Sequence, residues 1–194
     1  MSGGEAHGGG RARVGSVPDP HALPEILAAL EANSREIEDF FGGLPNEAFF
    51  SGDEQHWGPA HHLSHLSIAH RRVGRGLSTP AKLPRHESAR SRTFDQMREA
   101  YRARLAQVPP EQLRPNPLPP SIEPGASQRA LVDEYRDAAA AMRAAATAWS
   151  EDDCDSRAMP HPILGWLSAR EMLFFFVHHD RLHLENVRGR LGPG

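Results

Sequence analysis

The amino-acid sequence predicts an all-α protein, a helix bundle with one long connection, and two observations lead to this expectation. Apolar residues recur near the helical period in four long segments and one shorter segment, which is typical of helices that pack through one face. No segment alternates between apolar and polar residues for long enough to require a strand. The chain has 194 residues and no internal repeat, so we expect a single domain.

Proline and glycine bound the first two expected helices. The first helix follows Pro24 and ends at Gly42-Gly43, and its apolar positions are Ile26, Leu27, Leu30, Ile37, Phe40 and Phe41. The second helix opens at Pro59, because the first helical position tolerates a missing N–H. Its inner stripe consists of Leu63, Leu66, Val73 and Leu77. We expect this helix to be brought to an end by Gly74, Gly76 and Pro80.

The middle of the chain combines the shorter helix with the long connection. Residues 94–107 place Phe94, Met97, Tyr101 and Leu105 on one stripe of a helix. The following run, VPPEQLRPNPLPPSIEPGAS, contains seven prolines, which exclude regular helix and sheet. We therefore expect this Pro-rich run to be an extended ordered crossing or a linker.

Two further long helices complete the predicted bundle. The alanine-rich residues 127–149 have a strong helix propensity, and the expected inward positions are Leu131, Tyr135, Ala138, Met142, Ala145 and Trp149. The last helix has Ser168 as its N-cap and Glu171 at the position that closes a capping box. We expect it to run to about Val187.

Composition excludes several classes of protein. The formal net charge of −3 gives no basic footprint for nucleic acid, and no run approaches the length of a membrane span. The single cysteine, Cys154, excludes an intrachain disulfide framework and suits a reducing cytoplasm, and we expect it to be a surface or structural thiol beside carboxylates. Residues 1–20 lack the apolar segment of a signal peptide and predict a disordered tail. The helical domain is then 21–194.

Histidines suggest a metal site between the second and the last helix. His179 and His183 are four residues apart, so they share a helix face and can point at one ion. His65 lies between two inner leucines of the second helix and is the candidate third ligand. Three neutral nitrogens with open positions suit zinc, nickel or ferrous iron. The alternative is that these are packed polar side chains, because a chain with 12 histidines produces such spacings by chance.

Two motifs resemble the DinB-like superfamily, the DinB and YfiT bundle proteins. HWGPAHHLSHL is similar to its second-helix signature, a tryptophan followed eight residues later by His-Leu, here Trp57 and His65-Leu66. HPILGWLSAREMLFFFVHHDRLHLENV resembles its last helix, with a His-Pro-x-Leu-Gly stretch before His-x-x-x-His. The likeness covers about residues 24–190. HHDRLHLE also resembles the iron motif of ergothioneine-type sulfoxide synthases, whose reaction we do not expect without their second domain.

The resemblance implies an up-down-down-up four-helix bundle, a divalent metal held by His65, His179 and His183, and a homodimer. Superfamily members include hydrolases and transferases or isomerases that use mycothiol, bacillithiol or glutathione. We therefore expect a cytoplasmic metal-dependent hydrolase or thiol-dependent transferase that acts on a small molecule, through a nucleophile made from water or a low-molecular-weight thiol. The alternative is a non-catalytic bundle that binds a metal or ligand for sensing, stress response or structure.

Other polar side chains have weaker claims to a role. Glu171 and Glu185 could orient ligands or carry protons, but solvated helix-face carboxylates are the favoured interpretation. We expect His178 to lie behind the ligands or at the surface, and Asp180 to point away from the metal. The histidines expected at the surface or in loops are His56, His61, His62, His70 and His86.

Arginines and tryptophans complete the candidates. Three arginines near the end of the second helix could attract the carboxylates of a thiol, but a favourable interaction with the helix dipole is the preferred explanation; they are Arg71, Arg72 and Arg75. The three tryptophans are expected in the core or in a pocket wall; they are Trp57, Trp149 and Trp166.

Overall fold

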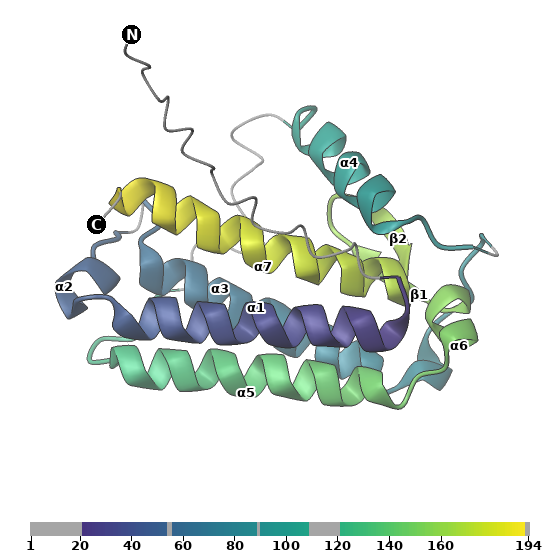
Figure 1. Ribbon diagram of the computed structural model, residues 1–194, viewed down its shortest axis with the longest axis horizontal. Coiled ribbons are helices and arrows are strands. Elements are labelled where there is room, and N and C mark those ends of the chain that lie inside the picture. The colour runs from purple at the N-terminus through teal and green to yellow at the C-terminus, as the bar shows by residue number, and fades with distance from the viewer. Residues whose placement is uncertain (1–20, 54–55, 89, 109–120, 193–194) are drawn as a thin grey trace, which may run out of the picture.

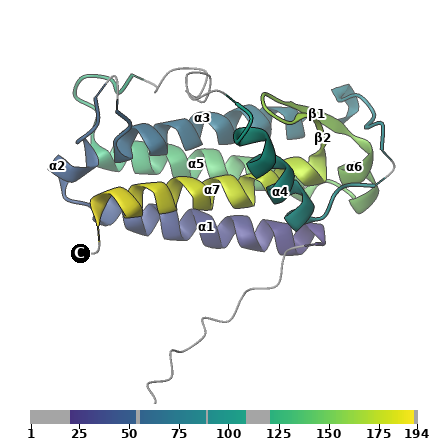
Figure 2. The same cartoon turned by 90° about the horizontal axis from the view of Figure 1, so that it is seen from above.

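The computed structural model describes residues 21–53, 56–88, 90–108 and 121–192. Four long helices lie side by side (Figures 1 and 2) and agree with the four predicted segments to within a few residues; they are α1 (Leu23–Gly43), α3 (Pro59–Leu77), α5 (Gln128–Thr147) and α7 (Ala169–Leu191). The predicted all-α class is therefore confirmed. The expected tail of residues 1–20 and most of the Pro-rich run, residues 109–120, fall outside the described residues.

The last helix, α7, runs beside the first in the same direction. The Asn33 amide donates to the carbonyl of Val177 over 2.9 Å, and further along both helices Arg188 donates to Glu36 over 2.6 Å. Asn33 and Val177 are both buried, so this hydrogen bond holds α1 and α7 together where water cannot compete.

The alanine-rich helix α5 runs against α1 and along α3. At its start the Gln128 amide donates to the carbonyl of Phe41 near the end of α1, and just past its end the Trp149 indole N–H donates to the carbonyl of Leu77 at the end of α3. The backbones of α3 and α5 approach closely at Gly74, where a Cβ atom would lie 3.2 Å from the Cα of Met142. The absence of a side chain at Gly74 therefore allows the two helices to cross closely.

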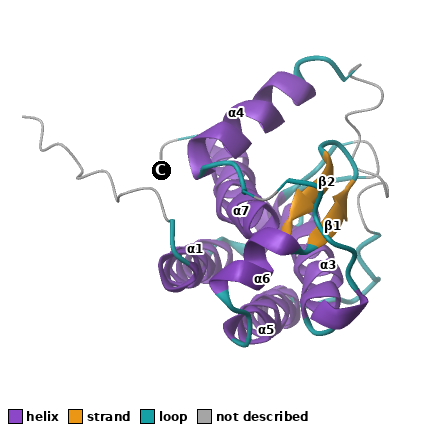
Figure 3. Ribbon diagram, turned by 90° about the vertical axis from the view of Figure 1, so that its right-hand side faces the viewer, coloured by secondary structure: helices purple, strands orange, loops and turns teal. Residues whose placement is uncertain are grey.

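Shorter elements lie at the ends of the four long helices or beside them. They are α2 (Asn46–Phe49), the 3-10 turn η1 (Pro80–Lys82), α4 (Phe94–Leu105), α6 (Glu151–Ser156) and the strands β1 (Ala158–His161) and β2 (Gly165–Ser168). The predicted shorter helix is α4, which packs outside the long helices against α7 (Figure 3). The sequence did not predict α2 or α6, which are too short to show a helical period.

The expectation of no strand was wrong, because β1 and β2 pair as an antiparallel hairpin. Each strand has only four residues, which is too short for an alternating pattern to be recognised. Gly165 adopts a φ of 75°, which glycine tolerates without strain. The ring Nδ1 of His161 accepts hydrogen bonds from the backbone N–H groups of Ile163 and Leu164, so a side chain shapes the turn.

The core consists of two clusters of buried apolar side chains that follow the long helices. The larger lies toward the hairpin end and includes Met142, Leu173, Phe174 and Phe176; the smaller lies toward α2 and includes Ile37, Phe41, Leu63 and Tyr135. Within the part of the chain that the structure describes, no helix combines the length and the apolar character needed to cross a bilayer.

Cys154 on α6 belongs to the larger cluster and is buried, so of the two expected locations, surface or structural, the structural one holds. Burial raises the pKa of its thiol to about 12, and the neighbouring carboxylates of Glu151 and Asp155 add to the shift. At neutral pH the side chain is therefore an uncharged thiol that fills space in the core.

Candidate metal centre

The structure brings together the three histidines that the sequence singled out. The Nε2 atom of His179 lies 3.1 Å from Nε2 of His183 and 3.3 Å from Nε2 of His65. One ring nitrogen from each of the three residues lies within 4.8 Å of the other two, so they form a group that could hold a metal ion. We call this group the three-histidine cluster.

Two helices position the cluster. α7 places His179 and His183 one turn apart on a face that turns toward α3, and α3 passes in the opposite direction with His65. Phe175 and Phe176 pack against the ring of His179, with centroids 4.8 and 5.8 Å away. Because these contacts leave the imidazole little freedom, the orientation of His179 is set by the core of the protein.

Burial keeps the three imidazoles uncharged at neutral pH. Desolvation lowers the pKa of His65 to about 4, and it lowers the pKa values of His179 and His183 far below the usual range, with the neighbouring histidines adding to the effect. An uncharged imidazole has one nitrogen lone pair free to bind a metal. The chemistry of this donor set therefore fits zinc, nickel or ferrous iron.

A fourth histidine belongs to the site, although the sequence analysis placed it at the surface. The side chain of His62 is only 5% exposed, and its Nδ1 lies 2.7 Å from Nδ1 of His183. The prediction was wrong because α3 is covered by both α5 and α7, so its buried face is wider than the leucine stripe alone indicates. His62 precedes the inner residue Leu66 by one turn, which was the available signal.

His70 was also expected at the surface and is in fact buried. It lies four residues after Leu66, on the same row of α3 as His62, and pairs with the buried carboxylate of Asp180. Asp180 was expected to point away from the metal, and its carboxylate faces His70 instead of the cluster. Of the other histidines expected outside the core, His56 is exposed, and His61 and His86 are partly buried.

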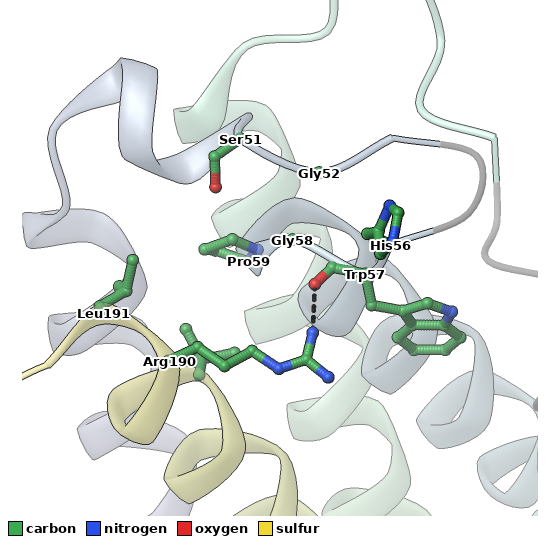
Figure 4. A pocket seen from close by; sticks show the side chains of 9 residues that line it. Ser51, Gly52, His56, Trp57, Gly58, Pro59, Arg190 and Leu191 are labelled. Atoms are coloured by element: carbon green, nitrogen blue, oxygen red, sulfur yellow. Dashed lines mark hydrogen bonds between the residues drawn. The ribbon is translucent and has the colours of Figure 1, made fainter.

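Trp57 lies against the three-histidine cluster from the segment before α3. The centroid of its indole is 5.2 Å from that of His62, 5.3 Å from that of His65 and 6.2 Å from that of His183. This position fits the expected role of a pocket wall. Arg190 holds the segment in place, because its guanidinium donates to the carbonyl of Trp57 over 2.8 Å (Figure 4).

A small hollow adjoins this segment but does not open on the cluster. Its lining consists of Ser51, Gly52, His56, Trp57, Gly58, Pro59, Val187, Arg190 and Leu191 (Figure 4). None of the three clustered histidines lines it. Trp57 is the residue that the hollow and the histidine contacts have in common.

Glu171 is neither a solvated carboxylate nor a neighbour of the cluster. It is buried, it completes the predicted capping box with Ser168, and it accepts from the backbone N–H and the guanidinium of Arg92 over 2.7 and 2.9 Å. These hydrogen bonds lower the pKa of Glu171 against the opposing effect of burial. Glu185 is exposed, and the half-buried His178 packs its ring 5.9 Å from that of Tyr101.

The arginines and the other tryptophans lie away from the cluster. Arg71 pairs with Glu134 on α5, and the neighbouring candidates Arg72 and Arg75 are exposed. Trp149 is buried in the core, as expected. Trp166 on the hairpin is 58% exposed, which contradicts its expected place in the core or a pocket wall.

Comparisons with known proteins identify a family. The model of the DinB superfamily matches residues 29–187, which include all three clustered histidines. Searches of curated proteins and of solved structures find no match. The matched region spans well over half of the 194 residues and contains all of α3 and α5 and most of α1 and α7, and we conclude that this chain belongs to the DinB superfamily.

Proposed function

We propose that the protein is a metal-dependent enzyme, a hydrolase or a thiol-dependent transferase, that acts on a small molecule through a divalent metal held by His65, His179 and His183. One observation carries this proposal: three uncharged imidazoles direct Nε2 atoms at one another over 3.1 and 3.3 Å. Each neutral ring has a single N–H, so these facing nitrogens cannot satisfy one another equally. A cation between them would use all three lone pairs.

The chemistry of this site would come from the ion and its surroundings. When bound, a divalent metal supplies Lewis-acid chemistry that lowers the pKa of a water molecule or a low-molecular-weight thiol. The chain itself holds the three donors in place and limits access of water. Phe175 packs on His179, and Trp57 covers His65 and His183 from the opposite end of the cluster.

A second candidate is a non-catalytic bundle that binds a metal for sensing or structure. The observation that favours it is the absence of a carboxylate beside the three-histidine cluster among the described residues. Glu171 accepts hydrogen bonds from Arg92 and from the backbone N–H of Ser168 at the start of α7, and Asp180 pairs with His70. A hydrolase commonly uses such a carboxylate to move protons, so an enzyme of this kind would depend on histidine or on its substrate.

We further propose an up-down-down-up arrangement of the four long helices. The pairs that support it are Asn33 with Val177 for parallel α1 and α7, and Gln128 with Phe41 for antiparallel α1 and α5. The contact between Trp149 and Leu77 indicates that α3 and α5 run the same way.

The low-molecular-weight thiol and the homodimer are proposals from family resemblance, and the cytoplasmic location is a proposal from the single cysteine. Ile68 and Trp166 are large apolar side chains that stay exposed in the single chain, and a dimer interface would cover such groups. Light scattering after gel filtration at two protein concentrations would measure the dimer directly.

Elemental analysis of protein purified without an affinity tag tests the metal centre. We expect close to one zinc, nickel or iron ion per chain, and loss of that ion in His65→Ala, His179→Ala and His183→Ala. His178→Ala is the matched control, because it removes a half-buried imidazole of α7 from outside the cluster. A folded wild-type protein that neither contains nor takes up these metals would refute the proposal.

Cobalt substitution distinguishes the enzyme from the non-catalytic bundle. Open coordination positions let an added thiol or small anion change the visible spectrum of the cobalt protein. We expect such a change for the enzyme, together with hydrolase or transferase turnover that disappears in His65→Ala. A cobalt spectrum that no added thiol or anion perturbs would favour a closed structural or sensing site.

A further inference from the structure

The two ring nitrogens of His183 face different partners. Nε2 lies 3.1 Å from Nε2 of His179, inside the three-histidine cluster. Nδ1 lies 2.7 Å from Nδ1 of His62, on the side away from that contact. At this distance the two Nδ1 atoms form a hydrogen bond, so one of them carries a proton and the other presents a lone pair.

The position of this proton decides whether His183 can bind a metal through Nε2. A neutral imidazole carries its proton on one nitrogen and a lone pair on the other. If His183 carries the proton on Nδ1 and donates it to His62, its Nε2 presents a lone pair to the cluster. If His62 donates instead, the proton of His183 sits on Nε2, points into the cluster and blocks the donor atom.

We propose that His62 is a positioning residue, which accepts the Nδ1–H of His183 and thereby holds His183 in the tautomer that offers Nε2 to the metal. This inference rests on the proposed function. A hydrogen-bond acceptor behind a ligating histidine commonly fixes its tautomer and ring orientation, and loss of such an acceptor costs 10- to 100-fold in metal affinity. Here the acceptor is an imidazole rather than a carboxylate or a carbonyl.

Two further observations bear on this role. Nε2 of His62 is buried and has no hydrogen-bond partner within the described residues, so Nδ1 is the ring nitrogen through which His62 makes its polar contact. When His62 accepts through Nδ1, its own proton lies on Nε2. Nδ1 of His179 is likewise buried and without a partner in that part of the chain. His183 therefore has an acceptor that His179 lacks, and the tautomer is controlled from the α3 side through His62.

Two substitutions of His62 distinguish the loss of its hydrogen-bond acceptor from the loss of its side-chain volume. His62→Leu keeps a buried side chain but removes the acceptor, and we expect a 10- to 100-fold weaker zinc affinity in a competition titration with a chromophoric chelator. His62→Asn places an amide oxygen near the former Nδ1 and should recover most of that loss. His178→Leu, the control on α7, should bind zinc like the wild type.

Nitrogen NMR of histidine-labelled protein reads the tautomer itself. We expect His183 to carry its proton on Nδ1, and His62 to have an unprotonated Nδ1, both in metal-free and in zinc-loaded protein. Equal zinc affinity of His62→Leu and wild type, a proton on Nε2 of His183, or coordination of zinc by His62 would each overturn the inference. If the wild type takes up no metal, the proposed function fails, and the tautomer in metal-free protein still decides the inference about His62.

Discussion

His70 on α3 and Asp180 on α7 form a buried pair, with Nε2 of the histidine 2.9 Å from Oδ1 of the aspartate and side chains that are 1% and 0% exposed. The imidazole also packs edge-to-face on Phe176 and Tyr135. Asp180 directly follows His179 in the chain. The pair therefore fixes the rotation of α7 about its own axis next to the first clustered histidine of this helix. It joins the same two helices that supply the clustered histidines.

Breaking the pair should destabilise the protein strongly. His70→Leu or Asp180→Leu leaves a buried polar partner without its hydrogen bond, and we expect each to lower the free energy of unfolding by about 3 kcal/mol. The double variant should lose clearly less free energy of unfolding than the two single variants lose together, because it leaves neither group unpaired. Urea unfolding of the four proteins at neutral pH measures this coupling. Strictly additive losses would show that the pair contributes no interaction energy.

Acid should weaken the fold partly through His161. Its Nδ1 accepts two backbone N–H groups of the hairpin turn, and burial lowers its pKa to about 4 from a usual value of about 6.5. Between these two values the unfolded chain binds a proton that the folded chain does not. Stability is therefore unaffected by this group above pH 6.5 and falls by on the order of 3 kcal/mol as the pH decreases to 4.

His161→Asn isolates this effect, because its amide oxygen can still accept in the turn but does not titrate. Thermal unfolding of metal-free protein between pH 7 and 4 should show a shallower decrease for the variant than for the wild type. The other buried histidines titrate in both proteins and cancel in the difference. Parallel curves for the two proteins would exclude His161 as a source of the acid sensitivity.

Trp57 should report metal binding optically. Its indole lies between 5.2 and 6.2 Å from three imidazoles, which is close enough for a bound nickel or copper ion to quench its fluorescence. Titration of the wild type should quench a fraction of the emission that disappears in Trp57→Phe. Trp166→Phe, which changes an exposed residue of the hairpin, should retain the quenching. Undiminished quenching in Trp57→Phe would place the ion elsewhere.

Glu171 should matter for stability and leave the metal site intact. Replacement by alanine removes the capping box and the charged hydrogen bonds with Arg92, and we expect a loss of about 2–3 kcal/mol in the free energy of unfolding. Zinc content should stay at the wild-type level. Glu185→Ala is the control, because this exposed carboxylate should change stability by less than about 0.5 kcal/mol. Loss of zinc in Glu171→Ala would contradict this and show that Glu171 contributes to metal binding.

Local patterns were sufficient for the helices and for the start of the site. The helical period, Pro59 at the start of α3 and the capping box at Ser168 predicted the long helices to within a few residues, because these signals act within one element. The spacing of His179 and His183 placed both on one face of α7. The partner His65 followed from its position between two buried leucines.

The rest depends on how the helices meet, which no single element encodes. His62 and His70 lie beyond the leucine stripe, and their burial follows from the packing of both α5 and α7 against α3. The contact of His62 with His183 joins residues 121 positions apart, so it depends on the register of two antiparallel helices. The hairpin likewise depends on the side chain of His161, which accepts hydrogen bonds from the backbone of the turn.

The long sequence separation within the cluster has a consequence for the order of events in the cell. His65 and His179 are 114 positions apart, and α7 supplies two of the three nitrogens. A nascent polypeptide therefore cannot assemble the centre before α7 has left the ribosome and packed beside α1 and α3. Loading with metal would then follow folding, and the ion would stabilise the chains in which α3 and α7 have already packed together.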